Sequence, residues 1–240
     1  KSALIPVIEE RLKQHTGNKD GQAEALLKLK VCDAAAGSGH MVLAAARTIA
    51  WYLARVQSGE DNPAPSLYRG CLRDVIQHCI YAVDMNPDAV ELCKLALWLE
   101  GHNSGKPLSF LDHKIRNGNS LVGVTDLSVL KKGIPNEAYN PVTGDDKAVC
   151  AELKKANQPY LKFLEGKAGT GFQKSLDFGG EETEIHNFSA NYHQLEDIRQ
   201  DSIEAVQLVK ARFAKLRNDR AWFNDWNVCN IWTAAFFFPY

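Results

Sequence analysis

The sequence predicts an α/β protein, in which a Rossmann-like parallel sheet is flanked by helices and carries a helical insertion. Three short apolar segments each end in polar, turn-forming residues, at 31–40, 80–87 and 115–121. Segments with helical periodicity separate them, and this alternation is typical of a doubly wound parallel sheet. A length of 240 residues with 45% hydrophobic and 24% charged residues fits one such domain, with or without an insertion.

The first half of the chain is expected to hold all three strands. The expected elements are helices at 2–13 and 21–28, a strand at 29–32, a helix at 41–56, a loop at 58–66, a helix at 67–77, a strand at 79–83, a helix at 89–99, a short helical turn at 109–112 and a strand end at 114–116. The alanine-rich run at 41–56 has high helix propensity. The unbroken apolar run at 79–83 indicates a strand covered on both faces. Asn86 and Pro87 form a helix start, with Asn86 as N-cap.

The second half is expected to be helical. Helices at 145–164 and 192–216 are joined by a glycine-containing loop, and the aromatic segment at 222–238 is expected to return to the main core as a final helix. The predicted division is a partial α/β core at 1–124, a helical insertion at 125–220 and a terminal helix at 221–240. An apolar seam with the period of a packed helix pair consists of Tyr192, Leu195, Ile198, Ile203, Val206, Val209, Phe213 and Leu216.

The composition excludes several classes of protein. Lys and Arg total 28 against 29 Asp and Glu, so a net charge of -1 gives no chain-wide attraction to nucleic acid, although a local basic face would not show in that total. Six cysteines without a C-x-x-C pair predict a reducing cytoplasm and no metal site. Without an apolar run of about 18 residues or a signal peptide, a soluble, cytoplasmic protein is expected. Both ends of the chain have the character of cut ends, which predicts a fragment of a longer protein.

The last third of the chain is rich in cations. They are Arg199, Lys210, Arg212, Lys215, Arg217 and Arg220. Acids occur in the same segment, namely Glu196, Asp197, Asp201, Glu204 and Asp219. On a single long helix this mixture favours intrahelical ion pairing over a track for phosphate groups.

The candidate site begins where the first strand meets the next helix. Gly37 and Gly39 allow the backbone to approach a ligand, and the free N–H groups of the following helix point toward it. Asp33 ends the first strand, where a carboxylate can accept from a ligand ammonium group. Asp84 ends the second strand, from which α/β nucleotide sites take both ribose hydroxyls with one carboxylate.

The third strand adds a contact for a base. Asn119 can offer its amide to an adenine edge, followed by Ser120 and by Leu121 as an apolar contact to the ring. Ammonium, ribose and adenine in this order match S-adenosyl-L-methionine better than a dinucleotide. A dinucleotide fingerprint needs a third glycine where this chain has Val42, and its acid would follow sooner than Asp84.

These three segments carry a family resemblance. Asp-Ala-Ala-Ala-Gly-Ser-Gly-His at 33–40 resembles the D-P-A-C-G-S-G-H motif of N6-adenine DNA methyltransferases. Ala-Val-Asp-Met-Asn-Pro at 82–87 and Asn-Gly-Asn-Ser-Leu-Val-Gly at 117–123 are similar to the next two motifs. Residues 1–124 most resemble large restriction-modification and BREX-type phage-defence methylases. Ala34 and Ala36 replace the usual proline and cysteine, and we expect this to alter the rigidity of the turn and leave binding intact.

The resemblance assigns roles to these residues. It implies that Asp33, Gly37 and Gly39 serve the methionine end of S-adenosyl-L-methionine, Asp84 the ribose and Asn119 the adenine. His40 is expected near the cofactor without an acid–base role. The full expected cofactor-binding set is Asp33, Ala34, Ala35, Gly37, Ser38, Gly39, His40, Asp84, Met85, Asn119, Ser120 and Leu121.

The resemblance also implies that the loop motif for methyl transfer is missing from this chain. The family transfers the methyl group with an N/D-P-P-Y/F/W loop, whose ring stacks on a flipped base, and this chain contains no such motif. We expect that loop beyond Tyr240, and the family's tyrosine-threonine-proline motif before Lys1. The prediction is a cofactor-binding fragment without catalytic residues, taken from a protein that methylates adenine in double-stranded DNA. Defence-system subunits are a further class of partner.

Other functions stay open at this point. A nicotinamide-dependent (NAD) oxidoreductase and a non-catalytic Rossmann-like interaction module are the alternatives from other classes, and cofactor preference separates them. Methylation of RNA or protein is an alternative within the class.

Overall fold

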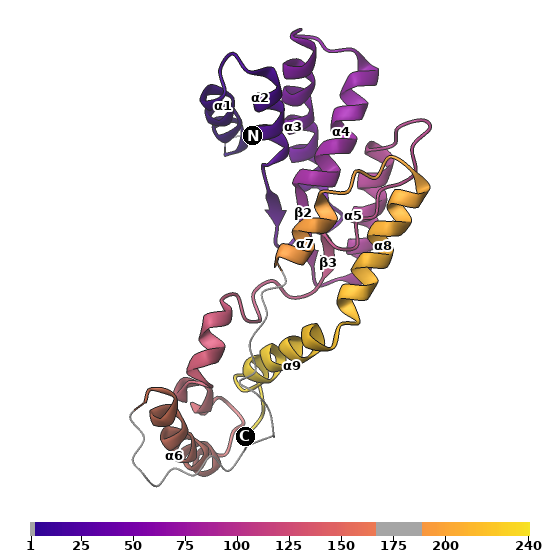
Figure 1. Ribbon diagram of the computed structural model, residues 1–240. Coiled ribbons are helices and arrows are strands. Elements are labelled where there is room, and N and C mark those ends of the chain that lie inside the picture. Colours follow the sequence, from indigo (N-terminus) through magenta and orange to yellow (C-terminus); the bar gives the residue numbers. More distant parts are fainter. Residues whose placement is uncertain (1–2, 167–188) are drawn as a thin grey trace. The chain divides into compact units, whose positions relative to one another are not determined.

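The computed structural model describes residues 3–166 and 189–240 (Figure 1). The chain divides into two compact units. The first is Lys1–Ser120 with Ser189–Lys215, and the second is Leu121–Phe188 with Leu216–Tyr240. This grouping differs from the division expected from the sequence, because 189–215 belongs with the first unit and 221–240 with the second.

The first unit contains a small parallel sheet, as predicted for a mixed α/β protein. Its strands β1 (Val31–Asp33), β2 (Ile80–Asp84) and β3 (Ile115–Asn117) lie in the order β1-β2-β3. Asp33 pairs with Ala82, and Asp84 pairs with Asn117. Because the strands are parallel, their carboxyl ends and the residues that follow share one edge of the sheet.

Five helices accompany this sheet in the first half of the chain. They are α1 (Leu4–Gln14), α2 (Lys19–Leu27), α3 (His40–Ser58), α4 (Pro65–Cys79) and α5 (Pro87–Glu100). Of these, α3, α4 and α5 are the ones that pack on its strands. The predicted helix start at Asn86 is confirmed, since its side chain accepts from the Asp88 N–H and Pro87 takes the first helical position. The expected loop at 58–66 is shorter than predicted, because α4 already begins at Pro65, which suits a first-turn position.

The core of the first unit lies between these helices and the sheet. Ile49 and Leu53 of α3 are fully buried, together with Leu26 of α2 and Ile80 of β2. Each such side chain contributes about 2 kcal/mol when it is removed from water. This packing gives the carboxyl edge of the sheet a rigid base.

The prediction of one long helix at 192–216 is wrong. The structure has two helices, α7 (Ser189–Glu196) and α8 (Ile203–Arg217), with a break between them. At the break, Gln200 is buried: its carbonyl accepts from the Arg73 guanidinium at 2.6 Å and its side-chain oxygen accepts from the Phe110 N–H at 2.6 Å. These two contacts hold the chain in a turn that a continuous helix could not form.

The apolar seam of this segment packs differently from the prediction. Instead of facing another helix of an insertion, buried Leu195 and Val209 surround Phe110 of the first unit. Phe213 lies against the same ring at 5.6 Å. Ile203, which we expected in the seam, is 61% exposed. The segment at 189–215 therefore extends the α/β unit.

The second unit contains two short 3-10 helices, η1 (Leu127–Lys132) and η2 (Asn136–Tyr139), and two long helices, α6 (Lys147–Leu164) and α9 (Arg220–Ala234). Helix α6 agrees with the predicted helix at 145–164. The Trp232 indole N–H donates to the Gly133 carbonyl at 3.1 Å, and the Asp146 N–H donates to the Tyr240 carbonyl at 2.7 Å. The terminal helix thus packs within this unit, where the sequence led us to expect a return to the main core.

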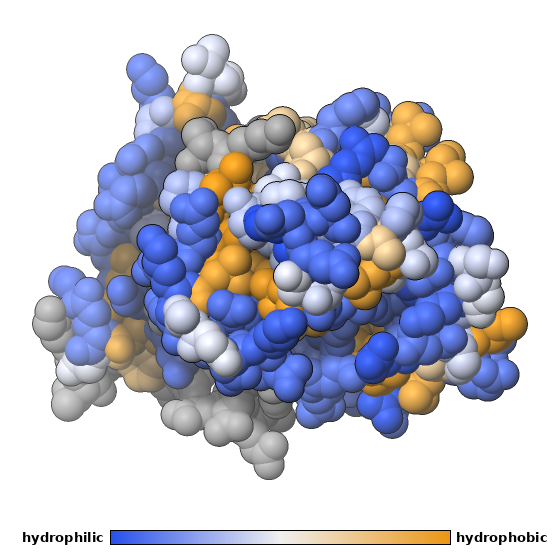
Figure 2. All heavy atoms as spheres, turned by 90° about the horizontal axis from the view of Figure 1, so that it is seen from above, coloured by the Kyte–Doolittle hydropathy of each residue, from blue (hydrophilic) through white to orange (hydrophobic). Residues whose placement is uncertain are grey.

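The surface carries exposed apolar side chains among many charged ones. The face in Figure 2 is largely hydrophilic, and its hydrophobic residues lie in narrow strips between hydrophilic ones. Among residues 3–166 and 189–240, no helix combines the length and the apolar character needed to cross a membrane.

Candidate cofactor site

The three sequence segments of the expected site meet at the carboxyl edge of the sheet. The Ala36 N–H donates to the Val83 carbonyl at 3.0 Å, which ties the glycine turn to β2. The Ser120 hydroxyl donates to the Ala34 carbonyl at 2.7 Å, and the Gly118 N–H donates to the Asp84 carbonyl at 2.9 Å. Residues more than eighty positions apart in sequence are therefore held together by direct hydrogen bonds.

The Asp84 carboxylate connects two of these segments. Its Oδ2 accepts from the Gly37 N–H at 2.8 Å, and its Oδ1 accepts from the Asn86 N–H at 2.9 Å. The bonds from Asn86 and Gly37 lower the pKa of Asp84, so the carboxylate is charged at neutral pH. Each carboxylate oxygen has a second lone pair, and Asp84 can therefore hold the turn and still accept from a ligand hydroxyl.

Glycine is needed at the two positions of the turn for different physical reasons. Both have positive φ, +53° at Gly37 and +90° at Gly39, which disfavours any side chain. A Cβ on Gly39 would also lie 2.6 Å from Sγ and 3.3 Å from Cα of Cys93, so Gly39 lets α3 pack against α5. A Cβ on Gly37 would meet nothing within 4 Å. Gly37 thus leaves open space beside the turn, where a ligand can approach.

The start of α3 faces this turn. Gly39 is the N-cap of the helix, and because glycine has no side chain it cannot satisfy the N–H groups of the first turn. On either side of Gly39, Ser38 Oγ and His40 Nδ1 lie within hydrogen-bond distance of each other, at 3.0 Å. An uncapped helix N-terminus of this kind favours polar or anionic ligand groups.

Asp33 also has a local role. Its Oδ1 accepts from the Ala35 N–H at 3.0 Å, which closes the turn that follows β1. Met85 and Leu121, both expected to contact the cofactor, have 70% and 92% of their surface exposed. The exposed Met85 side chain is available to a ligand at this edge of the first unit.

Sequence reasoning missed Asn117. Its side-chain amide donates to the carbonyls of Asp84 and Met85, both at 3.0 Å, and so fixes the chain where it leaves β2. The sequence directed attention to Asn119, which is exposed. The signal for Asn117 was its place as the last residue of β3, directly beside Asp84 in the register.

A cavity of about 290 Å³ adjoins this edge, between the start of α5 and β3. It is lined by Pro87, Asp88, Val90, Glu91, Lys94, Asp112, Ile115, Arg116 and Asn117. Lys94 forms an ion pair with Glu91 at 2.7 Å and another with Asp112. The cavity therefore carries internally compensated charge beside the candidate site.

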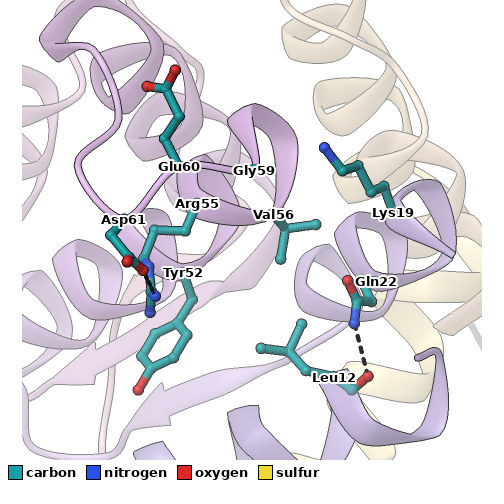
Figure 3. Close-up of a pocket in the computed structure, with 9 residues that line it drawn as sticks. All are labelled: Leu12, Lys19, Gln22, Tyr52, Arg55, Val56, Gly59, Glu60 and Asp61. Carbon is teal, nitrogen blue, oxygen red and sulfur yellow. Dashed lines mark hydrogen bonds and ion pairs between the residues drawn. The ribbon is translucent and has the colours of Figure 1, made fainter. Parts of the chain in front are cut away.

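A second cavity of about 310 Å³ lies at the other end of α3 (Figure 3). Tyr52, Arg55 and Val56 of α3 form one wall, and Lys19 and Gln22 of α2 form the opposite one. Along α3, Tyr52 is the lining residue nearest to the glycine turn, and it follows Gly39 by about 20 Å at 1.5 Å per residue. This cavity is therefore distinct from the candidate cofactor site. The described residues also contain no group of three His, Cys, Asp or Glu side chains that could hold a metal ion.

The fold and this edge define an α/β protein with a strand–glycine turn–helix segment at the carboxyl ends of parallel strands, a common location for ligand sites. Over 118 residues, 43% of this chain, the sequence is 31% identical to a protein of Methanocaldococcus jannaschii named "Putative type II restriction enzyme and methyltransferase RM.MjaORFECS2P". The aligned part is about 9% of that relative's length. No family model matches the chain, and no solved structure matches it. The similarity supports the resemblance at the level of a restriction-modification methyltransferase.

Proposed function

We propose that this chain is the S-adenosyl-L-methionine-binding part of a DNA adenine-N6 methyltransferase from a restriction-modification or phage-defence system, built on a Rossmann-like domain. The observation that carries the proposal is the contact of the Asp84 carboxylate with the Gly37 N–H. It joins the first two resemblance motifs at the carboxyl edge of the sheet, and Ser120 joins the third to the first. The relative from Methanocaldococcus jannaschii, named as a restriction enzyme and methyltransferase, agrees in class.

The residues at this edge fit the chemical groups of that cofactor. We assign the ribose hydroxyls to the free lone pairs of Asp84, and the methionine end to Asp33 and the N–H groups at the start of α3. Asn119 and Leu121 are assigned to the adenine, as the resemblance implies. Open space at Gly37 and the exposed side chain of Met85 leave room for such a ligand.

The bound cofactor would supply an electrophilic methyl group, which the intact protein passes directly to an extruded adenine amine. Positioning accounts for most of the rate in such a transfer. This chain contains no N/D-P-P-Y/F/W motif to hold the amine. We therefore propose that the chain alone binds the cofactor without transferring its methyl group.

Calorimetric titration of the purified chain tests the proposal. We expect saturable binding of S-adenosyl-L-methionine and S-adenosylhomocysteine and no binding of NAD. Asp84→Asn should weaken binding by tenfold or more, because an amide replaces an acceptor oxygen. Asp88→Asn, an exposed acid in the first turn of α5, is the matched control and should bind as the unmodified chain does.

Three outcomes would contradict the proposal in different ways. Preferential binding of NAD would favour the oxidoreductase, and binding of neither ligand would favour an interaction module. Adenine methylation of duplex DNA by the chain alone would overturn the proposed lack of transfer.

A further inference from the structure

Helix α8 has an unusual distribution of charge. Positions 205–218 contain four cations and no acid. The acids that the sequence placed among these cations belong to α7, to the break after it, to the first turn of α8 or to the N-cap of α9, because the expected single helix is interrupted. Pairing along one helix therefore cannot neutralise the cations.

The neighbouring acids are engaged elsewhere. Glu196 of α7 accepts from Lys30 at 2.7 Å. Asp201 accepts from Lys106 at 2.6 Å, and Asp219 accepts from the N–H groups of Ala221 and Trp222 as the N-cap of α9. These contacts engage three of the five acids of the segment, Glu196, Asp201 and Asp219.

Three cations of α8 consequently remain exposed and unpaired. Lys210, Arg212 and Lys215 have no hydrogen-bond or ion-pair partner within the part of the chain that the structure describes. Val209 is fully buried and Phe213 half buried, and these two side chains pack against Phe110 of the first unit. One side of α8 thus fixes it to the protein, and the cations are open to solvent.

The position of α8 relates these cations to the candidate site. The Phe213 ring lies 5.6 Å from the Arg116 guanidinium. Arg116 belongs to β3 and stands next to Asn117, the register partner of Asp84. The C-terminal half of α8 is therefore near β3, and Figure 1 shows α8 on the side of the first unit where α5 and β3 lie.

We propose that Lys210, Arg212 and Lys215 form a surface that binds the phosphate backbone of duplex DNA. The inference rests on the proposed function, which requires a DNA substrate next to the cofactor. Arg212 and Lys215 lie about 60° apart around the helix and about 4.5 Å apart along its axis, so these two can reach neighbouring phosphates of one strand, while Lys210 adds a cation on the other flank of α8. Phosphate contacts of this kind orient a protein on the duplex without reading its sequence.

Binding of a fluorescently labelled duplex of arbitrary sequence, measured by anisotropy between about 50 and 200 mM salt, tests the proposal. The slope of log K against log salt should become shallower by about 2 to 3 in the triple variant Lys210→Gln/Arg212→Gln/Lys215→Gln, because each phosphate contact contributes about 0.9. The control Arg11→Gln/Lys13→Gln/Arg69→Gln removes the same charge from exposed positions of α1 and α4 and should leave the slope unchanged. Circular dichroism checks that both variants fold.

Equal slopes for the two variants, or no duplex binding by the unmodified chain at the lowest salt, would overturn the proposal. Cofactor titration of the same samples separates this result from the proposed function. A chain that binds S-adenosyl-L-methionine and fails the duplex test loses only the α8 surface. A chain that passes the duplex test and binds no cofactor contradicts the proposed function.

Discussion

The Gly37 N–H donates to Asp84 Oδ2 at 2.8 Å across 47 residues of sequence. The acid expected to bind the ribose thus also sets the conformation of the turn expected to hold the methionine end. The turn is therefore already formed before a ligand binds to Asp84. Any substitution of Asp84 alters both, so a loss of cofactor binding in Asp84→Asn reports the two roles together.

The two turn glycines should respond differently to alanine. Gly39→Ala adds a clash with Cys93 to an unfavourable φ, and we expect a loss of about 3 kcal/mol in the free energy of unfolding. Gly37→Ala meets open space, so only the unfavourable φ costs stability, about 1 kcal/mol. Urea unfolding measures both. Equal losses would show that Gly39 does not serve the packing of α3 on α5.

Asn117, the last residue of β3, and Asn119, two positions after it, should respond differently to substitution. Asn117→Leu removes two hydrogen bonds to backbone carbonyls and should cost about 2 kcal/mol of stability. Asn119→Ala should cost less stability than Asn117→Leu and should lower the affinity for S-adenosyl-L-methionine, because its amide is assigned to the adenine. Thermal unfolding and calorimetry on both variants test this. A larger stability loss at Asn119 would reverse the two assignments.

Glu196 should be a major determinant of how α7 is held. Its carboxylate bonds to Lys30 just before β1 and to Tyr81 in β2, and lies 3.6 Å from Lys114 just before β3. Because the Lys114 side chain is 1% exposed, Glu196→Gln leaves a buried cation without its counter-charge. We expect a loss of about 2 to 4 kcal/mol in urea unfolding. Glu10→Gln on α1, an exposed control, should change stability by less than about 0.5 kcal/mol.

The same carboxylate should make stability depend on acid pH. Hydrogen bonds from Lys30 and Tyr81 and the charge of Lys114 outweigh burial and lower the pKa of Glu196 to about 2 from the ordinary 4.5. Between these values the unfolded chain binds more protons than the folded one, so the contribution of Glu196 is present above pH 4.5 and is lost as pH falls toward 2. The urea midpoint should fall less between pH 5 and pH 3, about the middle of that window, in Glu196→Gln than in the unmodified chain. An identical fall in both proteins would contradict the role of Glu196.

Much of the first unit could be predicted from the sequence because its signals are local. The apolar run of β2, the N-cap at Asn86 and the positive-φ glycines after β1 depend on near neighbours in the chain. The prediction of one continuous helix at 192–216 was wrong because the interruption depends on Gln200. The partners of Gln200 are Arg73 and Phe110, which are about a hundred residues away in sequence. A periodic pattern contains no information about such distant partners.

The sequence by itself determined the α/β class, the parallel direction of the strands that strand–helix alternation implies, and the three polar segments at the strand ends. Only the tertiary structure decided which side chains join those segments, since the bonds of Asp84 to Gly37 and of Asn117 to Met85 exist only when the strands are paired. It also decided that 189–215 packs on Phe110. The physical reason is the same in each case: local propensity sets the elements, whereas burial and hydrogen-bond satisfaction between distant segments set their partners.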